Sequence, residues 1–174
     1  PLVFSLARIM IDFGYFALCL SLLTSGYALL SSLAGGRSNR LALVRSAENA
    51  MLATCLLLTL AVCVLWHALV THNFQVRFVA ENSNLAMPLF YTITSLWGGQ
   101  AGSLLFWGWI LSLYIAAVVL FYRHRYRELM PYAVSAMAAS SFFFCILHLF
   151  SADPFVTLPF KPEDGRGLNP LLQQ

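Results

Sequence analysis

Charged side chains are scarce in this sequence. Ten lysines and arginines and seven aspartates and glutamates make up only 10% of its 174 residues, whereas 60% are hydrophobic. A soluble domain usually carries about 25% charged residues, so this chain lacks the polar side chains needed to cover a surface in water. The net charge of +3 is also too small and too scattered to indicate nucleic-acid binding. The composition therefore predicts an integral membrane protein.

Motifs for catalysis and for metal binding are absent as well. The sequence contains no G-x-S-x-G, no H-E-x-x-H and no phosphate-binding loop. Its four cysteines form no C-x-x-C pair and lie in apolar runs, where we expect them to act as small hydrophobic residues. No acidic residue or lysine lies in the middle of a long apolar run, which argues against a proton-relay transporter or channel. We therefore assign no catalytic residue and no metal site.

Four long apolar runs dominate the sequence instead. A bilayer core about 30 Å thick needs roughly 20 apolar residues per helix, and the runs at about 13–33, 49–70, 102–122 and 132–150 meet this requirement. The apolar segment 88–97 is too short to span and predicts a short interfacial helix. The expected fold class is therefore all-α: a polytopic membrane protein with four transmembrane helices, one short interfacial helix and an extended C-terminal outer loop.

Two polar segments are expected on the outer side of the membrane. In the outer loop 71–87, apolar residues recur at every second position at Phe74, Val76 and Phe78, which predicts a short extended segment. The outer tail 151–174 contains four prolines and two glycines, which predict an extended loop. We expect residues 1–174 to form a single transmembrane domain of a larger protein, because the chain starts at Pro1 and not at a methionine.

The arginines indicate how the four spans are oriented. Loops 34–46 and 123–130 fall on the same side of a four-span bundle and together carry six arginines, against four lysines and arginines on the other side. Cytoplasmic loops are usually the ones enriched in these residues. This bias predicts that both termini, the outer loop and the outer tail lie outside the cytoplasm.

Small residues are concentrated at the start of the third span, in SLWGGQAGSLLFWGW (residues 95–109). Gly98 and Gly102 form a G-x-x-x-G pair, and Gly99 and Ser103 form a second small pair one residue later. On a helix such pairs leave a flat strip that another helix can approach closely. The strip can serve helix packing, or it can make room for a large flat ligand, and the sequence leaves both possibilities open.

Tryptophans and histidines supply further candidates. Trp97 fits the usual role of tryptophan as an interfacial anchor, whereas Trp107 lies more than a turn inside the span. His67 and His148 lie near the ends of the second and fourth spans, so we expect them at similar depth. Two such histidines can ligate a b-type haem axially. The simpler interpretation is that each imidazole is neutral and bonded to a carbonyl or water.

Four segments carry a more specific pattern: VRFVAENSN (76–84), WGGQ-x-GSLL-x-W (97–107), SADPF (151–155) and GR-x-LNPLLQ (165–173). In their order and spacing they resemble the N-terminal part of the CcmF family of cytochrome c haem lyase subunits, which includes the similar NrfE proteins. The resemblance covers nearly the whole chain. It departs from the family at Gln100-Ala101, where family members commonly have His-Glu or Gln-Glu.

The resemblance implies a role in cytochrome c maturation. It implies that the protein receives haem from the periplasmic chaperone CcmE and helps attach it to the C-x-x-C-H motif of apocytochrome c. Other implied partners are the remainder of the CcmF-like chain, CcmH- and CcmI-type lyase subunits, and membrane lipid. The implied location is the bacterial inner membrane, with the mitochondrial inner membrane as the alternative. The family's haem-handling motif and b-haem histidines lie beyond the LNPLLQ segment, so this segment alone is not expected to ligate haem.

The WGG motif gives the residues that we expect nearest to the haem-handling surface. They are Trp97, Gly98, Gly99, Gln100, Gly102, Ser103 and Trp107. The rival hypothesis is a membrane b-type haem electron carrier with His67 and His148 as axial ligands.

Overall fold

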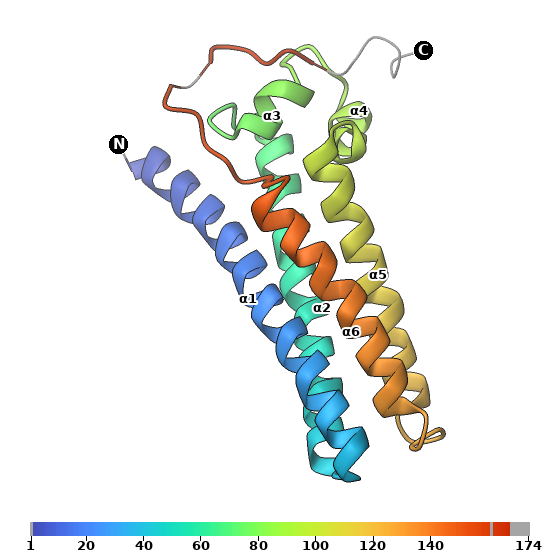
Figure 1. Cartoon of the computed structure of the whole chain (residues 1–174). Coiled ribbons are helices and arrows are strands. Elements are labelled where there is room, and N and C mark those ends of the chain that lie inside the picture. Colours follow the sequence, from blue (N-terminus) through green and yellow to red (C-terminus); the bar gives the residue numbers. More distant parts are fainter. Residues whose placement is uncertain (1, 161, 168–174) are drawn as a thin grey trace.

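The computed structural model describes residues 2–160 and 162–167, and it shows a helical bundle (Figure 1). Four long helices run side by side, and each contains a stretch long and apolar enough to cross a membrane. They are α1 (Leu2–Ser38), α2 (Leu41–Val70), α5 (Gln100–Tyr122) and α6 (Met130–Phe150). The all-α polytopic fold and its four membrane helices are confirmed.

The first helix is longer than a membrane requires. Its 37 residues correspond to a length of roughly 55 Å at 1.5 Å per residue, whereas a bilayer core is about 30 Å thick. Figure 1 shows the N-terminal half of α1 leaning away from the other long helices. Arg8 and Asp12 lie in this half with exposed side chains, so their charges can stay outside the apolar layer.

A cap covers the end of the bundle at which α2 and α6 end and α5 begins (Figure 1). We define the cap as residues 71–99 together with residues 151–160 and 162–167. It contains the helices α3 (Arg77–Asn82) and α4 (Leu89–Thr94) and a 3₁₀ turn at Ser95–Trp97. The expected interfacial helix is α4, on which Thr92 is buried while Leu89 and Phe90 are 60% and 71% exposed. The described tail residues contain no helix, as the prolines predicted.

The expectation of a short extended segment in the outer loop 71–87 is wrong for most of residues 76–82. Val76 does form an isolated antiparallel bridge with Thr157, but the chain then turns into α3. Phe78, Val79 and Ala80 are three successive buried residues, a pattern that a half-buried strand with alternating faces does not allow. Burial against the start of α5 and the tail therefore decides the local structure, and the period of two does not.

Two apolar cores hold the bundle together, and α2 contributes to both. The core near the cap includes Leu18, Leu58, Leu65 and Leu105, and the second core includes Met51, with Ile115, Val119 and Val134 from α5 and α6. Short polar contacts also link the helices. The hydroxyl groups of Thr24 and Thr54 lie 2.8 Å apart across α1 and α2, and Ser32 donates a hydrogen bond to the Pro131 carbonyl. Small hydroxyl residues allow helices to approach closely in lipid.

The end of the bundle away from the cap carries the arginine-rich connections α1–α2 and α5–α6 (Figure 1). Here Arg123, which follows α5, forms an ion pair of 3.3 Å with Glu48 of α2. The Glu48 side chain is only 3% exposed. This pair joins the start of one membrane helix to the end of another.

Candidate functional site

The cap brings three of the distinctive sequence segments together around α3. Residues 76–84 form α3 and the turn after it, and residues 97–103 form the end of the 3₁₀ turn and the start of α5. Residues 151–160 and 162–167 pass over α3 and form backbone hydrogen bonds with it. These segments are separated by up to about 90 residues in the sequence. Their convergence makes the cap the candidate functional site.

The glycines at the start of α5 give room to α3 and to the preceding turn. A Cβ atom on Gly102 would overlap both the carbonyl oxygen of Leu96 and the Phe78 ring. A Cβ on Gly99 would lie 2.8 Å from the Asn82 side-chain oxygen. Gly99 and Gly102, two of the predicted site residues, are therefore packing positions. Their neighbours belong to the cap and not to another membrane helix.

The G-x-x-x-G interpretation required Gly98 and Gly102 to share one helix. The helix begins only at Gln100, with Gly99 as its N-cap residue, and Gly98 ends the 3₁₀ turn. The two glycines therefore do not form a strip on one helical face. The second pair differs as well, because Ser103 donates a hydrogen bond of 2.7 Å to the Trp97 carbonyl and ties the turn to the helix.

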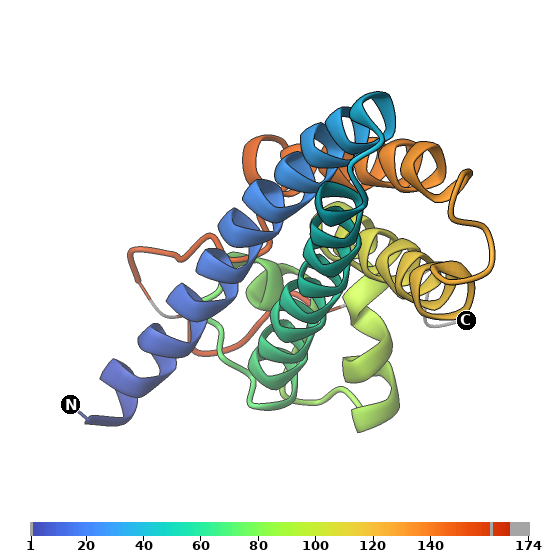
Figure 2. The ribbon, with the colours of Figure 1, turned by 90° about the horizontal axis from the view of Figure 1, so that it is seen from below.

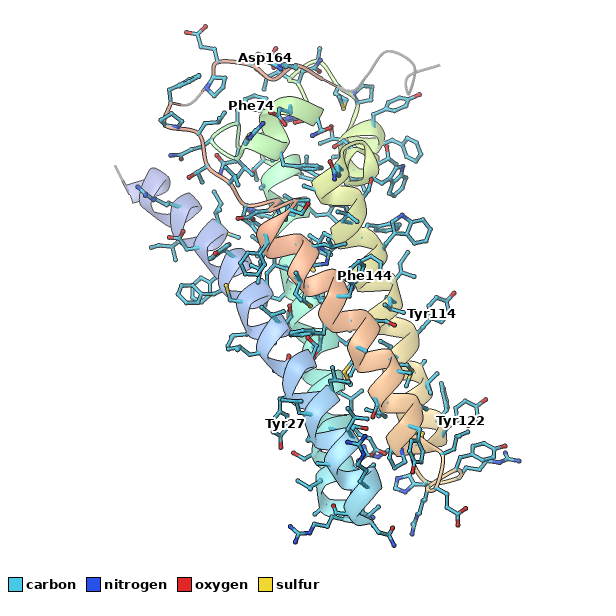
Figure 3. All side chains as sticks on the ribbon, in the orientation of Figure 1. Tyr27, Phe74, Tyr114, Tyr122, Phe144 and Asp164 are labelled. Atoms are coloured by element: carbon cyan, nitrogen blue, oxygen red, sulfur yellow. The ribbon has the colours of Figure 1, made fainter. Side chains whose placement is uncertain are left out.

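The tail is fixed to α3 by backbone hydrogen bonds. Arg166 N–H donates to the Ala80 carbonyl at 2.8 Å, and Gly167 N–H donates to the Ser83 carbonyl at 3.2 Å. The Asp164 carboxylate accepts a bond of 2.9 Å from Leu85 N–H, and Figure 3 shows Asp164 at the far edge of the cap. The GR dipeptide of the last motif is thus part of this clamp, whereas LNPLLQ lies outside the described residues.

The SADPF segment anchors the other end of the tail in the bundle. The Phe155 ring is buried. It lies 2.5 Å from the position that a Cβ atom on Gly14 of α1 would occupy, and the Val64 side chain of α2 borders the same position. Asp153 accepts a hydrogen bond of 2.8 Å from Phe155 N–H. Burial raises the pKa of Asp153 above its ordinary value, and the bond from Phe155 opposes this shift.

A pocket of about 290 Å³ opens between these three segments. Its polar lining comes from α3, from the start of α5 and from the residues after α6: Arg77, Glu81, Asn82, Gln100, Ser151 and Asp153. Arg77 and Glu81 form an exposed ion pair of 2.9 Å, which raises the pKa of Arg77. Ala101, which follows Gln100 in the WGG motif, also lines this pocket.

Aromatic residues continue from the cap into the membrane region. Trp97 and Phe106 have ring centroids 5.3 Å apart, Phe106 and Trp109 follow at 6.0 Å, and Trp109 meets Trp66 of α2 edge-on at 5.7 Å. Trp109 donates a hydrogen bond of 2.9 Å to Thr59. Trp97 and Trp107 remain 49% and 60% exposed. The aromatic series therefore joins the cap to α2 and leaves two indoles on the surface.

The two candidate histidines lie in different surroundings. His67 has an exposed side chain on α2, whereas His148 on α6 is fully buried and packs against Gly108 of α5 and the Phe144 ring. No cluster of three or more potential metal ligands occurs in the part of the chain that the structure describes. The two imidazoles therefore lie in different environments, one exposed on α2 and one packed between α5 and α6.

Several contributors to the cap lie in the quoted motifs but were not named as candidate site residues. Phe78 and Asn82 pack against Gly99 and Gly102, and Asp153 and Phe155 anchor the tail. Phe78 and Asn82 are four residues apart, and so are Val79 and Ser83. The Ser83 hydroxyl donates a hydrogen bond to the Val79 carbonyl. The spacing of four residues inside the VRFVAENSN segment, which is typical of a helix, was therefore the sequence signal that could have identified these residues.

Comparison with known proteins gives the relationship. No family model matches the chain. The cytochrome c-type biogenesis protein CcmF of Haemophilus influenzae is 33% identical over 166 residues, which are 93% of this chain and 25% of the relative. CycK of Rhizobium meliloti, also called a cytochrome c-type biogenesis protein, is 39% identical over 165 residues, covering 94% of this chain and 24% of the relative.

A solved structure described as the cytochrome c haem lyase CcmF agrees with the fold. It matches 86% of this chain with a TM-score of 0.79 and 25% identity, and the match covers 25% of that chain. The chain corresponds to the N-terminal part of CcmF-family proteins. It spans about a quarter of the length of the relatives. The comparisons with CcmF give no support to a b-type electron carrier with His67 and His148 as ligands.

Proposed function

We propose that this chain is the N-terminal membrane bundle of a CcmF-like haem lyase subunit in cytochrome c maturation. The relatives named as cytochrome c-type biogenesis proteins support this role. Within it, the cap supports haem handling and the attachment of haem to apocytochrome c. The observation that carries the second part is the convergence of three motif segments on α3, with a polar pocket between them.

The bundle itself acts as a scaffold in this proposal. The cap lies on the periplasmic side of the bacterial inner membrane, because the opposite end carries the arginine-rich connections. Haem is held by the part of the protein that corresponds to the remaining three quarters of the relatives. The exposed residues Trp97, Gln100 and Trp107 border the surface where the chaperone CcmE and apocytochrome c dock.

Hydrogen bonding and packing suit the cap to this supporting role. The tail is bonded to α3, Phe155 is wedged against α1 and α2, and Gly99 and Gly102 fit α3 against α5. Such a surface is held in one shape by several independent contacts. A docking surface gains affinity when it is preorganised in this way, because less conformational entropy is lost on binding.

Deletion of the gene from its host tests the proposed function. We expect c-type cytochromes to lose covalently bound haem while b-type cytochromes remain, as seen by haem staining of membrane proteins after denaturation. Re-expression of the full-length gene should restore the staining. Unchanged c-type cytochromes in the deletion strain would show that the protein acts elsewhere.

A further inference from the structure

The arginine-rich end of the bundle contains a pocket of about 450 Å³ between its two connections. One wall comes from the end of α1 and the start of α2, and the other from residues that precede and begin α6. Figure 2, which views the bundle from this end, shows the start of α6 beside the α1–α2 connection. The volume lies within the range of about 300–1,000 Å³ that is usual for small-molecule sites. We call this cavity, bounded by residues 35–44 and 127–132, the arginine-end pocket.

The wall that α1 contributes has a fixed backbone. Asn39 has a φ of 52°, and Arg40 N–H donates a hydrogen bond of 3.0 Å to the Gly35 carbonyl. A left-handed residue with such a bond across it is a common way for a helix to end. A Cβ atom on Gly36 would lie 3.0 Å from the Pro131 Cβ atom, so the missing side chain lets α6 begin close to α1. Hydrogen bonding and packing therefore hold this wall in place.

The charge around the pocket is strongly positive. Residues 34–48 and 123–130 contain six arginines, and their carboxylates are Glu48 and Glu128. Arg123 pairs with Glu48, whereas none of the other five arginines forms an ion pair in the part of the chain that the structure describes. Five arginines against the single carboxylate of Glu128 leave four positive charges in excess. This end of the bundle therefore attracts anions.

The side chains that line the pocket suit a phosphodiester that carries hydroxyl groups and acyl chains. Arg127 presents a guanidinium, which binds phosphate oxygens through two parallel hydrogen bonds. The Glu128 carboxylate accepts hydrogen bonds from hydroxyl groups, and the Asn39 amide both donates and accepts. Leu41 and Tyr132, 44% and 61% exposed, form an apolar wall beside these polar groups. An acyl chain covers this wall, whereas a free phosphate ion leaves it exposed.

We propose that the arginine-end pocket binds an anionic phospholipid with a hydroxyl-bearing headgroup, of the phosphatidylglycerol type. Arg127 holds the phosphate, and Asn39 and Glu128 bond to the glycerol hydroxyls. The acyl chains follow Leu41 and Tyr132 toward the membrane, because both residues stand at the start of membrane helices. The excess of arginines favours a lipid with a net negative charge over a zwitterionic one. The site lies at the opposite end of the bundle from the cap, so the inference goes beyond the proposed function and does not depend on it.

Native mass spectrometry of the full-length protein tests the proposal. The protein is mixed with phosphatidylglycerol, phosphatidylethanolamine or phosphatidylcholine that carry the same acyl chains, and the retained lipid is counted. Wild type should retain phosphatidylglycerol in preference to the other two. Arg127→Gln should retain it about fivefold less, in line with the contribution of one basic side chain at an anionic membrane surface. Because Arg127 is exposed, this variant should unfold at the wild-type temperature in lipid-free detergent.

Arg45→Gln is the matched control. It removes the same charge from the same end of the bundle, but Arg45 does not line the pocket. This variant should retain phosphatidylglycerol as wild type does. Equal losses in the two variants would show a diffuse attraction to the arginine-rich surface and would overturn the proposal. Equal retention of phosphatidylglycerol and phosphatidylethanolamine by wild type would also overturn it.

A photoreactive phosphatidylglycerol locates the site and identifies the source of the phosphate. With a diazirine near the headgroup, irradiation in nanodiscs that contain the full-length protein should label peptides from residues 35–44 or 127–132. Inorganic phosphate at millimolar concentration should not reduce this labelling, and Tyr132→Ala should reduce it. Labelling of other segments only, or competition by inorganic phosphate, would contradict a lipid site in this pocket. Because cytochrome c maturation enters neither measurement, failure here is distinct from failure of the proposed function.

Discussion

The Nε2 atom of His148 lies 2.7 Å from the place that a Cβ atom on Gly108 would occupy. His148 is fully buried on α6, and neither of its ring nitrogens has a hydrogen-bond partner among the described residues. The imidazole therefore fills the space left by the missing side chain of α5. The contact makes His148 a packing residue between two membrane helices.

Gly108→Ala should consequently push α5 and α6 apart. We expect a loss of about 1–3 kcal/mol in the free energy of unfolding, the usual cost of overpacking a tight interior. Combining it with His148→Ala, which removes the opposing ring, should make the double variant more stable than the sum of the single effects predicts. Unfolding in detergent by chemical denaturant measures all three variants. Strict additivity would contradict direct contact between the two sites.

The cap depends on the absence of a side chain at Gly102. In Gly102→Ala the new methyl group would overlap the Leu96 carbonyl, so the turn before α5 must move and α3 loses its seat. Gly98→Ala is the matched control, because Gly98 is half-exposed and has φ −72° and ψ −19°, which alanine adopts freely. We expect faster proteolysis of the cap in Gly102→Ala only. Similar protease resistance in both variants would show that the cap tolerates a displaced α3.

The ion pair at the arginine-rich end should behave as a buried pair. Arg123→Ala leaves the Glu48 carboxylate, 3% exposed, without its partner, and removing one member of such a pair commonly costs about 3–5 kcal/mol. Because Arg123 is itself 22% exposed, we expect the lower part of this range. Glu48→Gln combined with Arg123→Ala should recover part of the loss in denaturant titrations. A double variant that is less stable than Arg123→Ala would refute this view of the pair.

Asp153 should give the cap a pH dependence of defined sign. Burial raises its pKa above the ordinary value of 3.8, so the folded cap binds this proton more tightly than the unfolded chain does. Its contribution to stability is therefore fully present below the ordinary value, and it is lost as the pH rises through the folded pKa. Asp153→Asn keeps an oxygen to accept the Phe155 N–H bond and removes the charge.

Hydrogen exchange of residues 151–158 measures this effect as the difference between wild type and Asp153→Asn. The variant should be the better protected of the two at neutral pH, and the difference should shrink at acidic pH. Taking the difference removes every contribution that is common to the two proteins. Wild-type protection that rises with pH relative to the variant would reverse the assigned sign.

The sequence predicted the long helices well because hydrophobic length alone determines a membrane span. In the cap it predicted α4 and the extended tail but not α3, which is too short for periodicity to decide. The alternation at Phe74, Val76 and Phe78 resembles a strand, yet burial of Phe78 against Gly102 favours a helix of six residues. That contact joins residues distant in sequence, so no local pattern contains it.

The candidate site residues were also predicted only in part. The WGG motif was correctly located at the start of a membrane helix, but the helix begins at Gln100, and Gly98 and Gly102 therefore do not share a face. His67 and His148 were expected at similar depth. Which side of a helix is buried depends on its neighbours, and this places His148 in the interior and His67 on the surface.

The most direct test of the cap as a supporting surface for haem attachment uses its exposed residues. In a strain lacking the native gene, full-length protein carrying Trp97→Ala and Gln100→Ala is compared with a control carrying Leu30→Ala, far from the cap on α1. Covalent haem in c-type cytochromes is measured by haem staining at matched membrane levels of the two proteins. We expect the cap variant to yield several-fold less holocytochrome c than the control. Equal yields from the two variants would contradict the account.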